Sequence, residues 1–235
     1  MKILTNEKNI RRNAKIGQYT SLASLLILAG GMYVSFVYPT QLYISFLALL
    51  VGFILSQVGI YFGNRWGRRP RIDERLTSAL KGLTKDYTIY HFLTPVNHLL
   101  VGPAGISIIE PYYQRGTIAY EGGRWRQKGG GLLLGYLKVF AQEGLGRPDV
   151  EVKADIDNLT ESFKKTLGEG QQVPPINAVM VFTDDRAVLQ VEGAPTPAMK
   201  IDQLKEYLRK IAKQTPMPIS EIKAITDLLP EESIE

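Results

Sequence analysis

The 235-residue sequence contains no cysteine, and between Ile16 and Asn64 it contains no Asp, Glu, Lys, Arg or His. Without cysteine, disulfide frameworks, thiolate metal sites and cysteine nucleophiles are excluded, and the composition suits a reducing cytoplasm. The long uncharged run excludes a plain soluble protein, because soluble domains place charged side chains on their surface. Hydrophobic residues make up 45% of the chain and charged residues 22%, so long disordered regions are not expected.

The positive charge is confined to one part of the chain. Residues 1–71 carry nine Lys and Arg residues and a single acid, Glu7, which gives a net charge of +8. Because the whole chain has a net charge of +5, residues 72–235 carry −3. The second part therefore lacks the basic excess that non-specific nucleic-acid binding uses. The basic residues flank the uncharged run, where we expect them to meet anionic lipid headgroups.

The uncharged run is long enough for two membrane-spanning helices. Each needs roughly 20 apolar residues, and the run provides them at about 18–37 and 42–62, with a turn at Tyr38–Gln41 that contains Pro39. In hydrocarbon, a helix is the form that satisfies every backbone amide internally. Aromatic residues fall at the expected interfaces, at Tyr38, Tyr43, Tyr61 and Trp66.

Both flanks of this predicted hairpin are basic, and its turn is uncharged. The positive-inside rule then predicts a multi-pass protein of the cell membrane with both termini in the cytoplasm. A cleaved signal peptide is not favoured, because no A-x-A pattern is present and a second span follows at once. The hairpin has no ionisable group, so we interpret it as an anchor. Gly30, Gly31 and Gly52 could permit close helix packing, but we interpret them as tolerated small residues.

The chain after residue 71 predicts a mixed α/β or α+β sandwich, in which helices cover a central sheet. A glycine-rich segment, Gly129–Gly135, is not a phosphate-binding loop, because no Gly-Lys-Ser/Thr follows it. The predicted elements are a helix over 72–83; strands over 86–93, 98–101, 106–110, 117–120 and near Trp125; a helix over 152–167; strands over 177–182 and 187–191; a helix over 201–211; and a helical turn after Glu221.

Residues 72–126 resemble the nuclease-related domain, NERD, a branch of the PD-(D/E)XK nuclease superfamily. The resemblance rests on "LTKDYTIYH", on "NHLLVGPAGISIIEPYYQRG" and on Arg124-Trp125, and it continues more weakly through Arg147–Glu151 and Asn177–Phe182. It implies a restriction-endonuclease-like fold. The chain then divides into a basic cytoplasmic N-terminus (1–16), two membrane helices (17–64), a basic linker (65–71), a NERD-like domain (72–213) and a C-terminal helical tail (214–235).

The resemblance also implies a catalytic site, from which this sequence departs. Enzymes of the superfamily hold Mg²⁺ or Mn²⁺ between two acids, and a lysine two residues beyond the second acid stabilises the developing charge. Here Asn97 stands at the first acid, Glu110 retains the second, and Tyr112 replaces the lysine. Removing one electrostatic group typically costs roughly 10²–10³-fold in rate. The metal positions implied by the family are thus Glu110 and Asn97, and no cofactor is expected unless nuclease activity survives.

Several residues are candidates for the missing groups, each with a structural alternative. Glu74 or Asp73 matches the family's helix acid, but the first turn of a helix favours an acid in any case. Glu110 itself is alternatively an acceptor of backbone amides at a strand end. His98 points away from Asn97 in a regular strand, so we expect it to be packed or exposed. The remaining candidates are Lys128, Arg115 and Arg124 as displaced cations, and Trp125 with Tyr112 and Tyr113 as either a base-stacking surface or ordinary sheet packing.

These observations leave three hypotheses. The first is a membrane-anchored NERD-like domain that has lost catalysis and acts in binding, sensing or scaffolding. The second is a weak or altered divalent-metal nuclease that acts on DNA or RNA through Glu110 and Glu74. The third is an architectural membrane protein whose cytoplasmic part binds another protein or its own copies.

Overall fold

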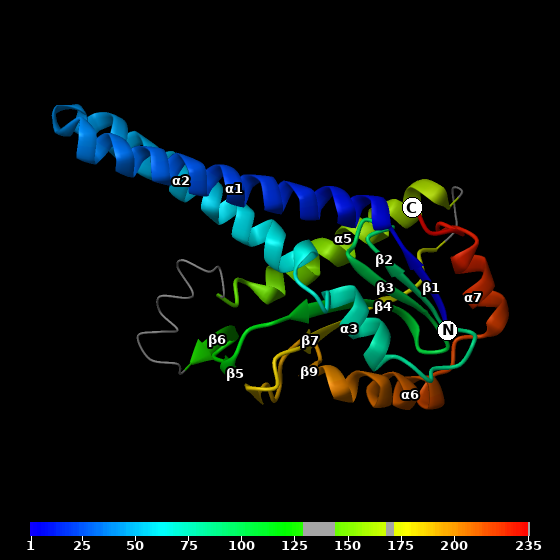
Figure 1. Cartoon of the computed structure of the whole chain (residues 1–235). Helices are drawn as coiled ribbons and strands as arrows, with labels where there is room; N and C mark the ends of the chain where they lie inside the picture. Colours follow the sequence, from blue (N-terminus) through cyan, green and yellow to red (C-terminus); the bar gives the residue numbers. More distant parts are fainter. Residues whose placement is uncertain (129–143, 168–171, 235) are drawn as a thin grey trace. The chain divides into compact units, whose positions relative to one another are not determined.

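The computed structural model describes residues 1–128, 144–167 and 172–234, and the glycine-rich segment Gly129–Gly135 lies outside the described residues. Among the described residues the chain forms two compact units (Figure 1). One unit is Lys8–Arg71, which we call the hairpin. The other combines Met1–Glu7 with the described residues from Ile72 onward, and we call it the α/β domain.

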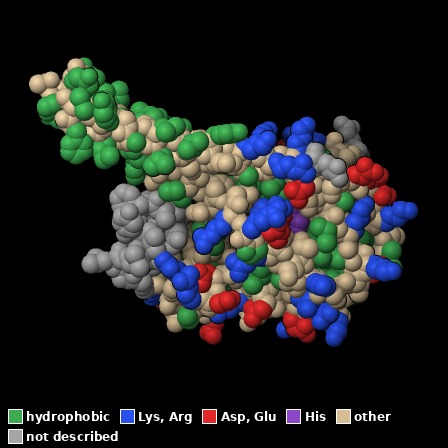
Figure 2. Space-filling model, in the orientation of Figure 1, with side chains coloured by type: hydrophobic (Ala, Val, Ile, Leu, Met, Phe, Trp, Pro, Cys, Tyr) green, Lys and Arg blue, Asp and Glu red, His purple; other side chains and the backbone are tan. Residues whose placement is uncertain are grey.

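The hairpin consists of two long apolar helices. Helix α1 spans Glu7–Val37, a short 3-10 turn spans Pro39–Gln41, and helix α2 spans Leu42–Phe62, followed by a π-helical turn over Gly63–Gly67. With a rise of 1.5 Å per residue, the 31 residues of α1 extend over about 46 Å and the 21 residues of α2 over about 32 Å. Both are long and apolar enough to cross a membrane, and apolar side chains cover the face of the hairpin seen in Figure 2. The prediction of two such segments is confirmed, although α1 begins inside the basic flank.

Small residues bring the two helices of the hairpin together. A methyl group at Gly31 would lie 2.6 Å from Cβ of Ala48, and one at Gly52 would lie 2.6 Å from Cδ2 of Leu28. The Ser24 hydroxyl donates a hydrogen bond of 2.7 Å to the carbonyl of Gly52. At Gly30, by contrast, no atom lies within 4 Å of the added carbon. Our interpretation of these glycines as merely tolerated is therefore wrong for Gly31 and Gly52, which permit close packing.

The α/β domain is built on a mixed sheet of six strands in the order β1-β2-β3-β4-β7-β9. The pairs β2–β3 and β3–β4 are antiparallel, whereas β1–β2, β4–β7 and β7–β9 are parallel. Helices flank the sheet, as the predicted α/β class requires (Figure 1). The strands span Lys2–Thr5 (β1), Thr88–His91 (β2), His98–Gly102 (β3), Gly105–Tyr112 (β4), Ile176–Phe182 (β7) and Ala198–Lys200 (β9).

Strand β1 is an element that the sequence did not predict. It lies before the hairpin in the chain, yet it pairs with β2, which lies after the hairpin. Leu4 of β1 is buried, with 5% of its surface exposed, in the same core cluster as Tyr90 of β2. On its other side the C-terminal tail continues the pairing, because Ile234 N donates to Thr5 O at 3.1 Å. The first residues of the chain therefore belong to the α/β domain and not only to a basic flank.

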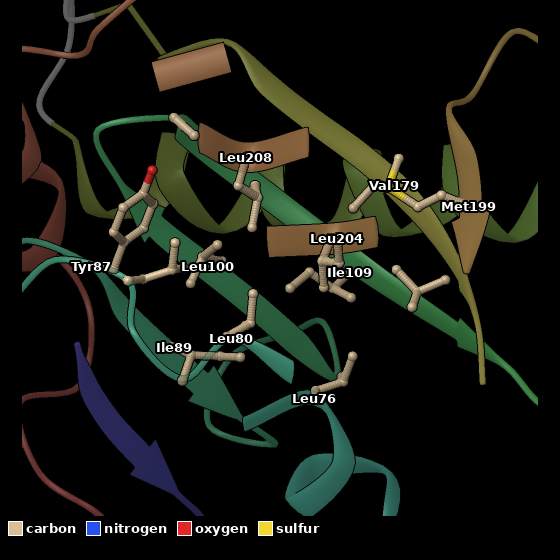
Figure 3. Packing of buried hydrophobic residues seen from close by; sticks show 13 residues of the cluster. Leu76, Leu80, Tyr87, Ile89, Leu100, Ile109, Val179, Met199, Leu204 and Leu208 are labelled. Carbon is tan, nitrogen blue, oxygen red and sulfur yellow. The ribbon is translucent and has the colours of Figure 1, made fainter. Parts of the chain in front are cut away.

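The two faces of the sheet have separate cores because successive side chains of a strand alternate between faces. One core combines Ile89, Leu100 and Ile109 with leucines from helix α3 (Ile72–Ala79) and helix α6 (Leu204–Gln214). Figure 3 shows Leu76, Leu80, Leu204 and Leu208 packed in this cluster. The other face packs against helix α5 (Pro148–Thr166) and helix α7 (Ile219–Thr226).

The two glycines of the Val-Gly-Pro-Ala-Gly turn between β3 and β4 have different roles. The ring of Tyr87 occupies the space where a side chain at Gly102 would lie. Gly105 has a φ angle of +87°, which side-chain-bearing residues rarely adopt. The predicted hairpin of strands on either side of this turn is confirmed.

A second sheet of three strands has the order β6-β5-β8. Strands β5 (Gly116–Glu121) and β6 (Arg124–Lys128) form an antiparallel hairpin, and β8 (Ala187–Gln190) pairs with β5 in parallel. These strands lie where the sequence predicts them. Strand β9 was not predicted, because a three-residue strand has no periodicity to detect.

Candidate functional site

Glu110 lies on β4, in the interior of the six-stranded sheet. The ladder between β4 and β7 is continuous from Ile106 to Tyr112, so side chains alternate regularly along the strand. Glu110 therefore shares its face with Ile108 and Tyr112, and this is the face covered by α5. The strand holds a single carboxylate at the position where the family has its second acid.

Asn97 comes directly before β3, and β3 is the neighbour of β4, the strand that carries Glu110. The paired register of β3 and β4 ends at Leu99 and Ile108, two residues from Asn97 and from Glu110. The backbone carbonyl of Asn97 accepts a hydrogen bond of 2.8 Å from Phe92 N, which fixes the chain at this point. The two implied metal positions therefore lie at the same end of the β3–β4 pair, Asn97 in the loop before β3 and Glu110 on β4.

Tyr112, at the position where the resemblance implies a lysine, is bound to a carboxylate. Its hydroxyl donates a hydrogen bond of 3.0 Å to Oε2 of Glu151 on α5, and its ring stacks on Phe182 with centroids 5.4 Å apart. Burial raises the pKa of Tyr112 above its usual value, and the charges of Glu151, Glu110 and Asp155 raise that pKa further. The phenol is therefore neutral at physiological pH and supplies no positive charge to this end of the sheet.

The helix acids Asp73 and Glu74 lie on α3, which covers the other face of the sheet. Leu76 of α3 packs in the same cluster as Ile109, and Ile109 points away from the face that carries Glu110. Asp73 is buried and Glu74 is partly exposed. Within the ranges that the structure describes, no three Asp, Glu, His or Cys side chains are arranged to hold a metal ion. With Asn97 in place of the first acid, the two positions that the resemblance implies for the metal hold one carboxylate instead of two.

The candidate cations belong to the three-stranded sheet or its approach. Lys128 donates to both carboxylate oxygens of Glu121, at 2.7 and 2.6 Å, and this contact lowers the pKa of Glu121. Arg124 is exposed on β6. The backbone carbonyl of Arg115 accepts a hydrogen bond of 2.9 Å from Gln127. Lys128 is thus engaged by an acid of its own sheet.

Sequence reasoning missed the part that α5 plays at this site. Glu151 accepts the hydrogen bond from Tyr112, and Asp155 lies one helical turn further along the same helix. The stretch Arg147–Glu151 pointed to this helix start, but nothing in the sequence paired Glu151 with Tyr112. The carboxylates around the phenol therefore come from β4 and α5, with none from α3 among the charges that shift its pKa.

The aromatic candidates are used in packing. Tyr112 is buried against Phe182, and the ring of Trp125 lies 5.4 Å from that of Tyr120 while Trp125 packs against a buried core cluster. Tyr113 is 44% exposed. Of these alternatives, ordinary sheet packing therefore accounts for Tyr112 and Trp125.

His98 is packed, one of the two states that we expected for it. It is 1% exposed, and its Nδ1 lies 2.9 Å from Nδ1 of His91 on the neighbouring strand. The Thr77 hydroxyl of α3 lies 3.0 Å from Nε2 of His91. This buried polar chain lies on the α3 side of the sheet, away from the face of Glu110.

Comparisons of the chain with models of known protein families, with curated proteins and with solved structures found no match in any of the three.

Proposed function

We propose that this chain is a membrane-anchored protein whose cytoplasmic α/β domain has a NERD-like, restriction-endonuclease-like fold that has lost metal-dependent catalysis. In this proposal the domain acts in binding, sensing or scaffolding at the inner face of the cell membrane. Its partners are the anionic lipid headgroups and either another protein or a second copy of the chain.

The hydrogen bond between Tyr112 and Glu151 is the observation that best supports the loss of catalysis. A PD-(D/E)XK site needs a cation at this position to stabilise the charge that develops during phosphodiester cleavage. The position holds a buried neutral phenol instead, and its hydroxyl is already bound to a carboxylate. The first acid position holds an amide at Asn97, so the two implied metal positions carry one charge instead of two.

The fold assignment is supported by the arrangement around Glu110. The acid lies on an interior strand of a mixed sheet that has helices on both faces, and Asn97 lies in the loop that enters the adjacent strand. The position of α3 on the opposite face from Glu110 weakens Glu74 and Asp73 as ligands of the same metal.

The membrane anchor is supported by chain connectivity as well as by hydropathy. Strand β1 precedes the hairpin and pairs with β2, which follows it, so the chain leaves the α/β domain and returns to the same domain. Both ends of the hairpin must then lie on one side of the membrane. The basic residues near both ends support the cytoplasm as that side.

The experiment that tests the catalytic part is a cleavage assay on the purified full chain with DNA and RNA in Mg²⁺ or Mn²⁺. We expect no cleavage above that of Glu110→Ala. Metal-dependent cleavage that Glu110→Ala abolishes would overturn the proposal and favour the altered nuclease.

The topology is tested on the same chain, which has no cysteine of its own. A single cysteine at Thr40 should react with an impermeant maleimide from outside the cell, whereas one at Ser233 should react only after permeabilisation. Equal labelling of both positions in intact cells would contradict the proposed anchor. Crosslinking in membranes separates binding from the alternatives, because recovery of monomers alone would contradict a scaffolding role.

A further inference from the structure

Strand β6 presents a row of cations on one side. Arg124, Arg126 and Lys128 are exposed, whereas Trp125 and Gln127 between them are partly buried. Alternate side chains of a strand point to the same face, with a spacing of about 7 Å. The strand is at the edge of the three-stranded sheet, so this row lies along the margin of the sheet, and Ala119 of the neighbouring strand is buried beneath the side chains around it.

The strand register defines the rest of this surface, which we call the cationic face. Thr117 and Ala119 of β5 lie opposite Lys128 and Arg126, and Glu121 lies opposite Arg124. On β8, Val188 and Gln190 lie beside Thr117 and Ala119. Glu121 is the only acid at these strand positions, and Lys128 binds it. The face is therefore positive, although residues 72–235 carry a net charge of −3.

The other side of this sheet holds its aromatic residues. Tyr120 and Trp125 are a cross-strand pair with rings 5.4 Å apart, and Trp125 packs against the buried cluster that contains Ile118. Among these strands, the cationic face thus offers no aromatic ring for base stacking, which single-stranded nucleic acid would use. The same face carries exposed Val188 on β8, with 55% of its surface accessible, on the other side of β5 from the cations.

We propose that the cationic face docks on the anionic phospholipid headgroups of the membrane that anchors the chain. A face that combines several cations with an exposed apolar side chain is typical of a surface that binds at the lipid interface. The proposal rests on the proposed membrane anchor, because a tether holds the face near the leaflet at high effective concentration. Each cation near an anionic surface changes the ratio of docked to undocked domain roughly fivefold.

The test uses the full chain in vesicles of phosphatidylcholine alone or of equal parts phosphatidylcholine and phosphatidylglycerol. Because the chain has no cysteine, Gln190→Cys carries a single fluorophore on the cationic face, and headgroup-attached quenchers report docking. A fluorophore at Ser220→Cys, exposed on α7, is the positional control. We expect quenching at position 190 in the anionic vesicles only.

The variant Arg124→Gln/Arg126→Gln should lower the docked-to-undocked ratio about 25-fold. The matched control is Lys210→Gln/Lys213→Gln on α6, which removes the same charge from exposed positions and should leave the ratio unchanged. Equal quenching in both vesicle types, or an equal effect of the two double variants, would overturn the proposal.

Two further outcomes also overturn it. If Arg124→Gln/Arg126→Gln causes self-association without changing the lipid response, the cations of β6 serve to prevent this edge strand from pairing with another chain. If the fluorophore responds to a single-stranded oligonucleotide and not to anionic lipid, the face binds nucleic acid. A chain that alkaline carbonate washes from the vesicles would instead contradict the anchor, so failure of the anchor is distinguished from failure of docking.

Discussion

His91 and His98 face each other across β2 and β3, with their Nδ1 atoms 2.9 Å apart, and they are the only histidines of the chain. Each ring is 1% exposed. A hydrogen bond between two imidazole nitrogens needs one donor and one acceptor, so the pair shares a single proton at this contact. Thr77 extends the chain of polar contacts from the strands to α3.

This pair predicts strong non-additivity. The substitution His98→Leu removes the partner of a buried ring nitrogen and should lower the free energy of unfolding by about 1–3 kcal/mol. Adding His91→Phe should cost less than the sum of the two single changes, because the second change removes the group left without its partner. Urea unfolding of the four chains in micelles measures this, and strict additivity would contradict the shared contact.

Strand β1 predicts that residues before the hairpin stabilise the domain after it. Leu4→Ala should lower the free energy of unfolding of the α/β domain by about 2–5 kcal/mol, because Leu4 is buried in a core cluster. Ile3→Ala, at a position that is 45% exposed on the same strand, is the matched control and should have little effect. Equal losses for the two variants would show that β1 does not pack as described.

The close approach of α1 and α2 predicts different effects for two adjacent glycines. Gly31→Ala should loosen the hairpin, because the new methyl group would lie 2.6 Å from Cβ of Ala48. Gly30→Ala meets no atom within 4 Å, and alanine favours a helix by about 1 kcal/mol over glycine. Migration on SDS gels and thermal loss of helical circular dichroism compare the two. A Gly31→Ala hairpin as compact as Gly30→Ala would contradict the packing.

Buried tyrosines predict that the domain is sensitive to alkali. Burial, with a further contribution from Asp227, raises the pKa of Tyr90 to about 12, and burial beside Glu151 raises that of Tyr112. A raised pKa in the folded state gives stabilisation that is complete below the unfolded value near 10 and is lost as the pH rises through the folded value. Between about pH 10 and 12, each such tyrosine should lower the free energy of unfolding by about 1.4 kcal/mol per pH unit.

The substitution Tyr90→Phe should make this decline less steep by the contribution of one tyrosine. Urea unfolding at a series of alkaline pH values measures the slope for the two chains. An unchanged slope in Tyr90→Phe would show that this side chain ionises equally in the folded and unfolded states.

The sequence predicted most elements, because their patterns are local. The apolar run of the hairpin and the Val-Gly-Pro-Ala-Gly turn each carry a signature within a few residues. Strand β1 could not be predicted in this way, since its four residues pair with a segment on the far side of the hairpin. The same limit applies to the site, where Tyr112 and Glu151 meet only through the packing of α5 on the sheet.

Sequence reasoning also left open which acids share a face. The sequence places Glu74 in the first turn of a helix, but it does not show which face of the sheet that helix covers. Glu74 therefore stayed a possible partner of Glu110. The packing of Leu76 against Ile109 decides the question, because it places α3 on the opposite face of the sheet. Only tertiary packing contains this information.

Calorimetric titration of the full chain in micelles with Mn²⁺ and with Mg²⁺ tests the loss of the metal site most directly. The account predicts no binding heat that Glu110→Ala removes, and it predicts that such heat is gained in Asn97→Asp/Tyr112→Lys, which restores the second carboxylate and the cation. Stoichiometric binding by the natural chain, abolished in Glu110→Ala, would contradict it.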